Sequence, residues 1–134
     1  MGLFTGKRPR GLGVRGGKFR PSPTTPNAVS SQADDELHRI APLAYAGSRE
    51  EAMAFLTSLV ESTPRAVIIV ATPDYFYAEF ESRWMGFVDD VEFYFPAYEK
   101  IIHVRSASRL GYRDFGVNRR RVERIRRQID AWQA

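Results

Sequence analysis

The chain has 134 residues, of which 43% are hydrophobic, with no cysteine and a formal net charge of +4. This length and apolar fraction fit one domain with a core of its own, and the lack of cysteine excludes a disulfide framework, a catalytic thiolate and a cysteine-ligated zinc site. No apolar run is long enough for a transmembrane helix or a signal peptide, so the sequence predicts a soluble, cytoplasmic protein.

Basic residues are concentrated at the two ends of the chain. Residues 1–20 contain six bases and no acids, and residues 118–134 contain six arginines against two acids. The middle of the chain is therefore acidic. Two interpretations follow: the basic ends dock on the acidic body of the same chain, or they form a basic surface for nucleic acid.

Residues 1–33 are predicted to form an extended basic arm, and residues 34–134 a single α+β domain. The arm is rich in Gly, Pro, Ser and Thr and has few large apolar residues, so it cannot bury enough surface to fold alone. Val14, Phe19 and Val29 are the expected anchors that hold the arm along the body.

The first half of the domain is predicted to contain a helix and two strands. A short extended segment at residues 41–45 comes first, and Ser48 should then cap a helix that ends before Pro64. The apolar run AVIIVA at residues 66–71 predicts a strand buried on both faces. Residues 75–84 alternate, which predicts a second strand facing the helix with Phe76, Ala78, Phe80 and Trp84.

A hairpin is predicted next, from alternation in residues 87–95 and 100–108 about a turn at residues 96–99. A four-residue turn sets the register of the two strands. In that register acid meets base and apolar meets apolar, which favours it. The expected pairs are Phe95–Lys100, Val91–Val104, Glu92–His103 and Asp90–Arg105.

Asn118 is predicted to be the N-cap of a last, arginine-rich helix. The order helix, four strands, helix argues for an α+β fold, with a four-stranded antiparallel sheet and both helices packed on one face. The extended N-terminal arm completes this architecture. The apolar stripe of the last helix is expected at Val122, Ile125, Ile129 and Trp132.

Four stretches are similar to one known family: GLGVRGGKF, TPNAVSSQ, FVDDVEFYF and IIHVRSASRLGYRDFGVNRRRVERIR. The chain resembles the domain of unknown function 1499 family of uncharacterised bacterial proteins over nearly its whole length. At two arm positions where many members carry cysteines, this chain has Ser22 and Ala28. The loss of both together fits a pair that forms a disulfide when present, and argues against a catalytic or metal-binding use of those cysteines. The resemblance implies no reaction.

One face of the predicted sheet gathers acidic side chains and a histidine. Carboxylates with an imidazole suit a metal site or a general acid–base pair. The alternative is a solvated face with Arg83 and Arg105 between the acids, and the sequence favours it because metal sites usually show closer spacing or more histidines. The residues on this face are Glu79, Glu81, Asp90, Glu92 and His103.

Asp89 is expected to differ from its neighbour Asp90. Alternation points Asp89 toward the core with Ser106 and Ser108, and a buried carboxylate must be paired. Arg109, Asn118 or an arginine of the last helix are its candidate partners. Asp90 should instead lie on the outer face beside Arg105, so Asp89 is expected to matter more to folding.

The stretch RSASR, followed by Gly111 and the head of the last helix, has the composition of an anion site. Arginines, serine hydroxyls and free helix N–H groups bind anions. The alternative is a polar loop that bonds only to its own backbone and to the arm. The predicted ligand-binding residues are Arg105, Ser106, Ser108, Arg109, Asn118, Arg119 and Asp89.

The sequence contains no P-loop, nucleophile elbow, dinucleotide-binding or paired-histidine motif. The leading hypothesis is a non-enzymatic binding or accessory module that recognises an acidic small molecule or protein partner, without a cofactor or metal. The alternative is a small hydrolase-like or isomerase-like enzyme that uses Asp89 or Asp90 with His103. Specific nucleic-acid binding is not expected, because Trp132 falls on the apolar stripe and is not free to stack on bases.

Overall fold

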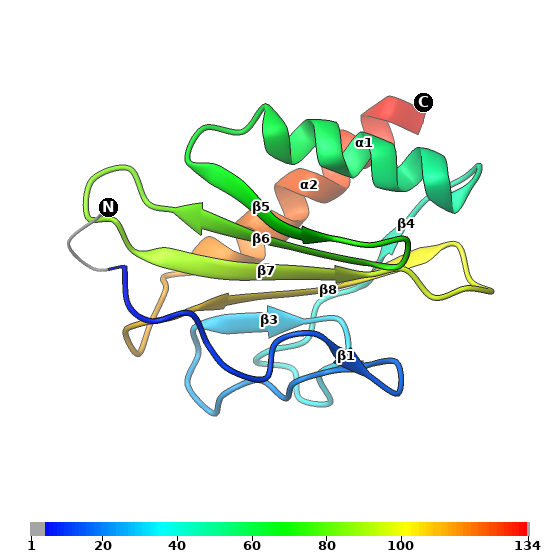
Figure 1. Cartoon of the computed structure of the whole chain (residues 1–134). Helices are drawn as coiled ribbons and strands as arrows, with labels where there is room; N and C mark the ends of the chain where they lie inside the picture. The colour runs from blue at the N-terminus through cyan, green and yellow to red at the C-terminus, as the bar shows by residue number, and fades with distance from the viewer. Residues whose placement is uncertain (1–4, 134) are drawn as a thin grey trace.

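The main sheet of the protein is antiparallel throughout and lies between two helices and the N-terminal arm (Figure 1). The computed structural model describes residues 5–133, so residues 1–4 of the arm and Ala134 lie outside the described part. The strands run in the order β3-β8-β7-β6-β5, and β4 pairs with the first residues of β8. Their bounds are β3 Ala28–Ser30, β4 Leu43–Ala44, β5 Ala66–Ala71, β6 Tyr75–Glu81, β7 Val88–Tyr94 and β8 Ile101–Ser108. The helices are α1 Arg49–Glu61 and α2 Val117–Gln133.

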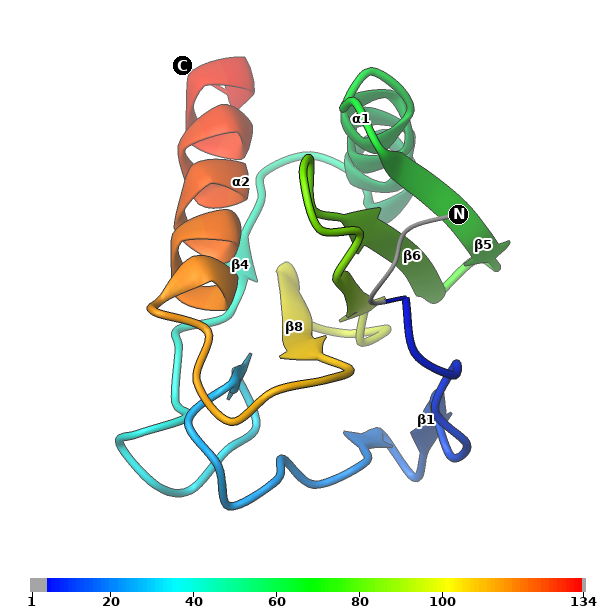
Figure 2. The same cartoon turned by 90° about the vertical axis from the view of Figure 1, so that its left-hand side faces the viewer.

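The α+β class is confirmed, but the prediction of four strands is wrong. Both helices pack on the same face of the sheet, as the end-on view in Figure 2 shows. The sheet is larger than predicted because β3 and β4 each pair with β8. These two strands are three and two residues long, so they carry no alternation that sequence analysis detects.

The core lies between the helices and the sheet. It is built from apolar side chains of α1, α2 and the inward positions of the strands, which alternate as predicted. Its largest fully buried side chains include Leu43, Leu56, Phe76, Phe93, Phe95 and Ile102.

Helix α1 begins at the predicted cap. The Ser48 hydroxyl accepts a hydrogen bond from the Glu51 N–H (3.0 Å), and the Glu51 carboxylate accepts one from the Ser48 N–H (3.2 Å). This reciprocal capping box satisfies two backbone donors that have no partner within the helix. The chain leaves the helix before Pro64, as predicted.

Ser48→Ala should lower the free energy of unfolding by about 1 kcal/mol, because it removes the acceptor for the Glu51 N–H. Urea denaturation with an unchanged slope measures this loss. Ser58→Ala is the matched control, since Ser58 is exposed in the middle of the same helix and should change stability by less than about 0.5 kcal/mol. Equal shifts for the two variants would contradict the capping role.

The apolar run of β5 predicts burial on both faces, and this is wrong. β5 is the edge strand of the sheet, and its Val67 and Val70 are exposed. Helix α1 covers one face of β5, whereas on the other face of the sheet the arm is tied to β6 by Arg8 and to β7 by Gly13. Trp84 also differs from its predicted place on the inner face: β6 ends at Glu81, and Trp84 lies exposed in the turn that follows.

The predicted register of β7 and β8 is wrong by two residues. The turn is longer than four residues, because the Phe95 N–H donates to the Asp74 carbonyl (2.8 Å) instead of pairing with Lys100. A shift of two keeps every side chain on its predicted face but changes its partner. The observed pairs are Asp90–Ala107, Val91–Ser106, Glu92–Arg105, Phe93–Val104 and Tyr94–His103.

The arm covers the face of the sheet opposite the helices (Figure 2). It contains a small hairpin of β1 Val14–Arg15 and β2 Lys18–Phe19. Gly16 and Gly17 form its two-residue turn at φ 58° and 78°, a conformation that favours glycine. Arg8 Nε then donates to the Glu79 carboxylate (2.6 Å), which ties the arm to β6.

Asn118 is not the N-cap of α2, contrary to the prediction. Asp114 has this role from outside the helix: its carboxylate accepts hydrogen bonds from the N–H groups of Gly116 (2.8 Å) and Asn118 (3.2 Å). Asn118 lies within the first turn and is fully buried. The apolar stripe is buried as predicted at Val122, Ile125 and Ile129, but its fourth predicted member, Trp132, is 39% exposed and stacks on Phe55.

Candidate ligand-binding site

The residues that the sequence proposes as a ligand site lie on two different faces of the sheet. Side chains alternate along β8, so Arg105 points toward the arm while Ser106 and Ser108 point toward the helices. Arg109, just beyond β8, joins the arm-facing group, and Asp89 joins the helix-facing group. The predicted set is therefore divided between two separate groups, and Arg119 belongs to neither.

The arm-facing side of the sheet is buried. Asp90 is 1% exposed, and Glu92 and Arg105 are also buried. Gly13 of the arm lies directly over this side, and its N–H donates to Glu92 Oε2 (2.7 Å). The interpretation of these carboxylates as a solvated face is wrong, and so is the expected exposure of Asp90.

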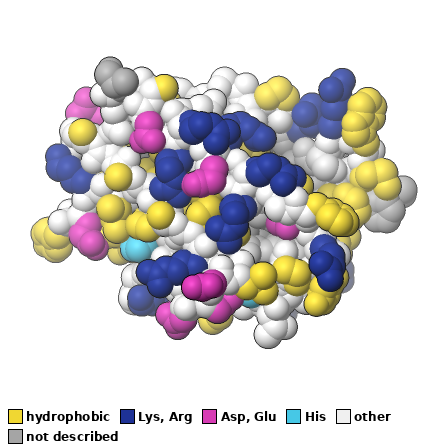
Figure 3. Space-filling view, turned by 180° about the vertical axis from the view of Figure 1, so that it is seen from behind, with side chains coloured by type: hydrophobic (Ala, Val, Ile, Leu, Met, Phe, Trp, Pro, Cys, Tyr) yellow, Lys and Arg dark blue, Asp and Glu magenta, His cyan; other side chains and the backbone are white. Residues whose placement is uncertain are grey.

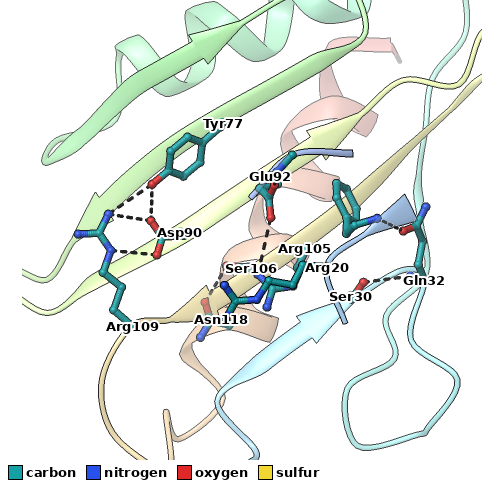
Figure 4. Close-up of polar contacts among 12 residues, drawn as sticks. Arg20, Ser30, Gln32, Tyr77, Asp90, Glu92, Arg105, Ser106, Arg109 and Asn118 are labelled. Atoms are coloured by element: carbon teal, nitrogen blue, oxygen red, sulfur yellow. Dashed lines mark hydrogen bonds and ion pairs between the residues drawn. The ribbon is translucent and has the colours of Figure 1, made fainter. Parts of the chain in front are cut away.

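Arg109 is held by acceptors from two strands (Figure 4). Its Nε and Nη2 donate to the two oxygens of Asp90 (2.9 and 2.8 Å), and Nη2 also contacts the Tyr77 hydroxyl (3.3 Å) and the Glu79 carboxylate. The hydrogen bond to Asp90 raises the pKa of Arg109 above its ordinary value. Burial, together with the hydrogen bond to Asp90, raises the pKa of Tyr77, so its hydroxyl stays protonated and donates to Asp90. This guanidinium is engaged inside the fold.

Glu92 and Arg105 form a second buried contact under the arm. Glu92 Oε2 accepts from the Tyr75 hydroxyl (2.5 Å), and Oε1 lies 3.6 Å from Arg105 Nη1. Burial lowers the pKa of Arg105 and outweighs the opposing effect of Glu92. The arm closes this pair off from solvent.

On the helix-facing side, Asn118 connects four parts of the chain, and Figure 4 shows it beside Ser106. Its Oδ1 accepts from the Ser106 hydroxyl (2.6 Å), and its Nδ2 donates to the Ser108 hydroxyl (2.9 Å). Nδ2 also donates to the Asn27 carbonyl of the arm (3.1 Å) and to Asp114 before α2 (2.8 Å). Burial is the largest single influence on the pKa of Asp114 and acts to raise it. The hydrogen bonds from the Asn118 side chain and from the N–H groups of Gly116 and Asn118 together outweigh burial and lower this pKa.

Asp89 is buried as predicted, and its partner is Arg121 of α2. Arg121 Nη2 donates to Asp89 Oδ2 (2.7 Å), while Nη1 donates to Asn118 Oδ1 (2.9 Å). The guanidinium also lies over the Phe80 ring at 5.0 Å from its centroid. The Arg121 side of this ion pair is therefore fixed by further hydrogen bonds, whereas Asp89 is held through Arg121.

An apolar pocket of about 310 Å³ opens beside this ion pair, at the end of the sheet where α2 begins. Its polar lining residues are Ser82, Asp89, Ser108, Arg113 and Asp114. Its apolar walls come from the β6–β7 turn and the β8–α2 loop, at Phe87, Val88, Leu110, Phe115 and Val117. An apolar hollow with a few convergent polar groups has the character of a small-molecule site.

A basic pocket of about 510 Å³ lies on the other side of the same ion pair, between the end of α1, the end of β6 and the middle of α2. Besides Arg121, it is lined by Arg65, Arg83 and Arg124 and by a single acid, Glu81. None of these three arginines has a carboxylate partner within residues 5–133. This arrangement of positive charges favours the binding of an anion.

The two pockets are neighbours. Ser82 lines both of them, Asp89 lines the apolar pocket, and Arg121 lines the basic one. The Asp89–Arg121 contact of 2.7 Å therefore forms part of the wall between an apolar hollow and a cationic one. Three of the predicted site residues belong to this candidate site. Asp89 and Ser108 line the apolar pocket, and Asn118 is joined to the site by its hydrogen bond from Arg121.

Arg119 and His103 lie elsewhere. Arg119 donates to the carbonyls of Arg39 (2.9 Å) and Leu37 (3.2 Å) and so fixes the segment before β4. His103 bonds through Nδ1 to the Ser31 hydroxyl (3.0 Å), and burial lowers its pKa.

The sequence alternative of an acid–base pair with His103 is not assembled. Asp90 pairs with Ala107, which lies four residues, or roughly 13 Å, along β8 from His103. Asp89 lies on the opposite face of the sheet. Neither carboxylate is within reach of the imidazole.

The sequence analysis missed the basic pocket. Arg121 was detectable in principle, because a spacing of three places it on the same helix face as Asn118. Arg65 and Arg83 belong to loops without periodicity. Arg65 also has φ 61°, an uncommon value for a residue other than glycine, which the sequence does not reveal.

Within residues 5–133 no group of three or more His, Cys, Asp and Glu side chains is placed to hold a metal ion. Across the same residues, no helix has both the length and the apolar character needed to cross a membrane.

Comparison with known proteins gives one match. The family model described as "Protein of unknown function (DUF1499)" matches residues 18–129. No curated protein and no solved structure matches the chain. The stretches singled out in the sequence fall largely inside the matched region.

Proposed function

The chain belongs to the DUF1499 family of proteins of unknown function, and from its own geometry we propose that it is a binding module for a small amphipathic anion. The acidic part of the ligand would lie in the basic pocket, and the apolar part in the neighbouring apolar pocket. The proposal is of binding without turnover.

The observation that carries this proposal is the contact between two pockets of opposite character. Ser82 lines both pockets, and the ion pair between Asp89 of the apolar pocket and Arg121 of the basic pocket lies at their boundary. A ligand with an anionic head and a short apolar chain matches both sides at once. Because Asp89 neutralises Arg121, the attraction for the head comes mainly from the unpaired Arg65, Arg83 and Arg124.

Burial of the ligand's apolar chain in the apolar pocket would add a hydrophobic contribution to the binding free energy. The pocket of about 310 Å³ lies at the lower end of the range of ligand sites, which supports a small ligand. Each buried methylene contributes about 0.8 kcal/mol. A head or a chain alone should therefore bind much more weakly than the two together.

The arginines of α2 support a small acidic ligand over a nucleic acid. Arg119 holds the carbonyls of residues 37 and 39, and Arg126 holds those of Ala41 (2.7 Å) and Pro42 (2.8 Å). These side chains are occupied along the body of the protein. They are not arranged as a free row that follows a phosphate backbone.

Calorimetric titration with octyl phosphate, below its micelle concentration, tests the proposal. We expect saturable binding by the parent protein, and weaker binding of octanol and of inorganic phosphate. Arg124→Gln should weaken octyl phosphate binding about tenfold, because a charge-assisted hydrogen bond contributes about 1.5 kcal/mol or more.

Arg127→Gln is the matched control. It removes the same charge from the same helix, but Arg127 does not line the basic pocket. Equal affinities of the Arg124→Gln and Arg127→Gln variants would show that the pocket is not the binding site. Equal affinities for octyl phosphate and inorganic phosphate would show that the apolar pocket has no part in binding.

A further inference from the structure

Two neighbouring loops present large apolar side chains to solvent at one end of the sheet. The β6–β7 turn carries Trp84 (82% exposed) and Met85, and the β8–α2 loop carries Leu110, Tyr112 and Phe115 (83% exposed). The bases of the loops are joined by the hydrogen bond from the Arg109 N–H to the Val88 carbonyl (3.1 Å). Together the five side chains form one apolar tip, larger than the scattered single residues of an ordinary surface.

The backbone holds one of these side chains outward against its own preference. Phe115 has φ 54°, in the left-handed region that bulky residues avoid. Arg120 Nη1 donates to the Phe115 carbonyl (2.8 Å), and Asp114 Oδ1 accepts from the Gly116 N–H (2.8 Å), so the conformation is fixed on both sides. A strained backbone conformation that keeps an aromatic ring exposed indicates a function for that ring.

The apolar tip also carries positive charge. The Arg83 guanidinium lies 4.7 Å from the centroid of the Trp84 ring, and the Arg113 guanidinium lies 5.5 Å from that of Tyr112. In residues 5–133 neither arginine has a carboxylate partner. In Figure 3 hydrophobic and basic side chains lie next to one another at the right-hand end, which is the end that carries these loops.

From this combination we propose that the apolar tip docks on an anionic lipid surface. Trp and Tyr prefer the boundary between headgroups and acyl chains, where an apolar ring and a polar edge are both satisfied. Arginines beside them attract anionic headgroups. The Asp114 carboxylate, between Arg113 and Phe115 in the sequence, is turned to N–H groups at the start of α2.

Docking in this orientation would bring the apolar pocket to the lipid surface, because Leu110 and Phe115 line both the pocket and the tip. An amphipathic anion would then pass between the surface and the pocket without crossing open water. This route rests on the proposed function, whereas the docking itself does not.

Vesicle sedimentation tests the docking. The parent protein should bind vesicles of phosphatidylcholine mixed with an equal amount of phosphatidylglycerol at least tenfold more strongly than vesicles of phosphatidylcholine alone. The double variant Trp84→Ser/Phe115→Ser should lose at least tenfold in binding to the anionic vesicles. Tyr98→Ser is the control, since Tyr98 is 101% exposed in the loop at the opposite end of the sheet.

Tryptophan fluorescence gives a second measurement that does not depend on removing the tip. Trp132, which stacks on Phe55 at 4.5 Å, is replaced by Phe, so that Trp84 is the only tryptophan. Emission of Trp84 should shift to shorter wavelength on addition of anionic vesicles, and Arg83→Gln/Arg113→Gln should weaken that response.

The docking proposal is overturned if emission does not change and the protein stays in the supernatant, as expected if the tip binds another protein. Failure of the two proposals can be told apart. If the parent protein binds octyl phosphate but not anionic vesicles, the docking alone is rejected; if it binds anionic vesicles but not octyl phosphate, the ligand pocket alone is rejected.

Discussion

Asp90→Ala should lower the free energy of unfolding by about 3 to 5 kcal/mol, the largest effect expected for any single acid in this protein. The Asp90 side chain is buried and accepts hydrogen bonds from Arg109 Nε (2.9 Å), Arg109 Nη2 (2.8 Å) and the Tyr77 hydroxyl. Its removal leaves the Arg109 charge under the arm with only Glu79 as a carboxylate partner. Urea unfolding at unchanged slope measures the loss.

Asp89→Ala should lower the free energy of unfolding less than Asp90→Ala does, which is the reverse of the order expected from the sequence. Asp89 is 7% exposed, against 1% for Asp90, and the structure gives it one hydrogen bond, from Arg121. Asp89→Ala should therefore cost about 1 to 3 kcal/mol. Asp130→Ala is the control for an exposed acid and should change stability by less than about 0.5 kcal/mol. A loss at Asp90 no larger than that at Asp89 would refute the account of the network under the arm.

Asn118→Ala should lower the free energy of unfolding by about 3 kcal/mol. The substitution leaves the Ser106 hydroxyl with only Arg121 as a partner, and removes a donor from the Asn27 carbonyl and the Ser108 hydroxyl. A buried polar group that loses its partner costs about 1 to 3 kcal/mol, and the new methyl group does not fill the space of the amide.

Hydrogen exchange separates this effect from a general loss of stability. The Ser108 N–H donates to the Asn27 carbonyl (3.0 Å), so its protection reports on the attachment of the arm to β8. Asn118→Ala should speed exchange at Ser108 more than at Val91 in the central strand β7. Gln128→Ala, on the exposed side of α2, controls for the change in helix propensity. Uniform acceleration at both amides would contradict a specific link to the arm.

Sequence patterns predicted the elements of the domain better than their pairing. The alternation of β7 and β8 placed every side chain on the correct face, because alternation depends on nothing beyond the strand itself. Alternation does not determine the register of the two strands. Opposition of Glu92 to His103 or to Arg105 brings acid and base together equally well, and a contact from Asp74 to Phe95, distant in the sequence, decides between them.

The sequence predicted that the arm lies along the body, but not which face of the sheet it covers. Its glycines and prolines carry no period, so no pattern indicates that face. For that reason Asp90 and Glu92 resembled solvated acids in the sequence but are buried in the structure. Only part of the candidate site was predicted, for a similar reason. The predicted residues Asp89, Ser108 and Asn118 belong to regular elements. The missed residues Arg65, Arg83 and Phe115 belong to loops.

The position of β8 between the two ends of the chain has a consequence for biosynthesis. β8 pairs with β3, which is made long before it, and α2, which is made after it, packs against β8. As the chain leaves the ribosome, strands β5, β6 and β7 can pair at once with their neighbours, and α1 is already made, but β3 has no partner until β8 is complete and α2 comes later still. During that interval Phe76 and Phe93 have no finished core to enter. Nascent chains halted before residue 101 should therefore bind chaperones, and release from the chaperone should follow soon after α2 emerges.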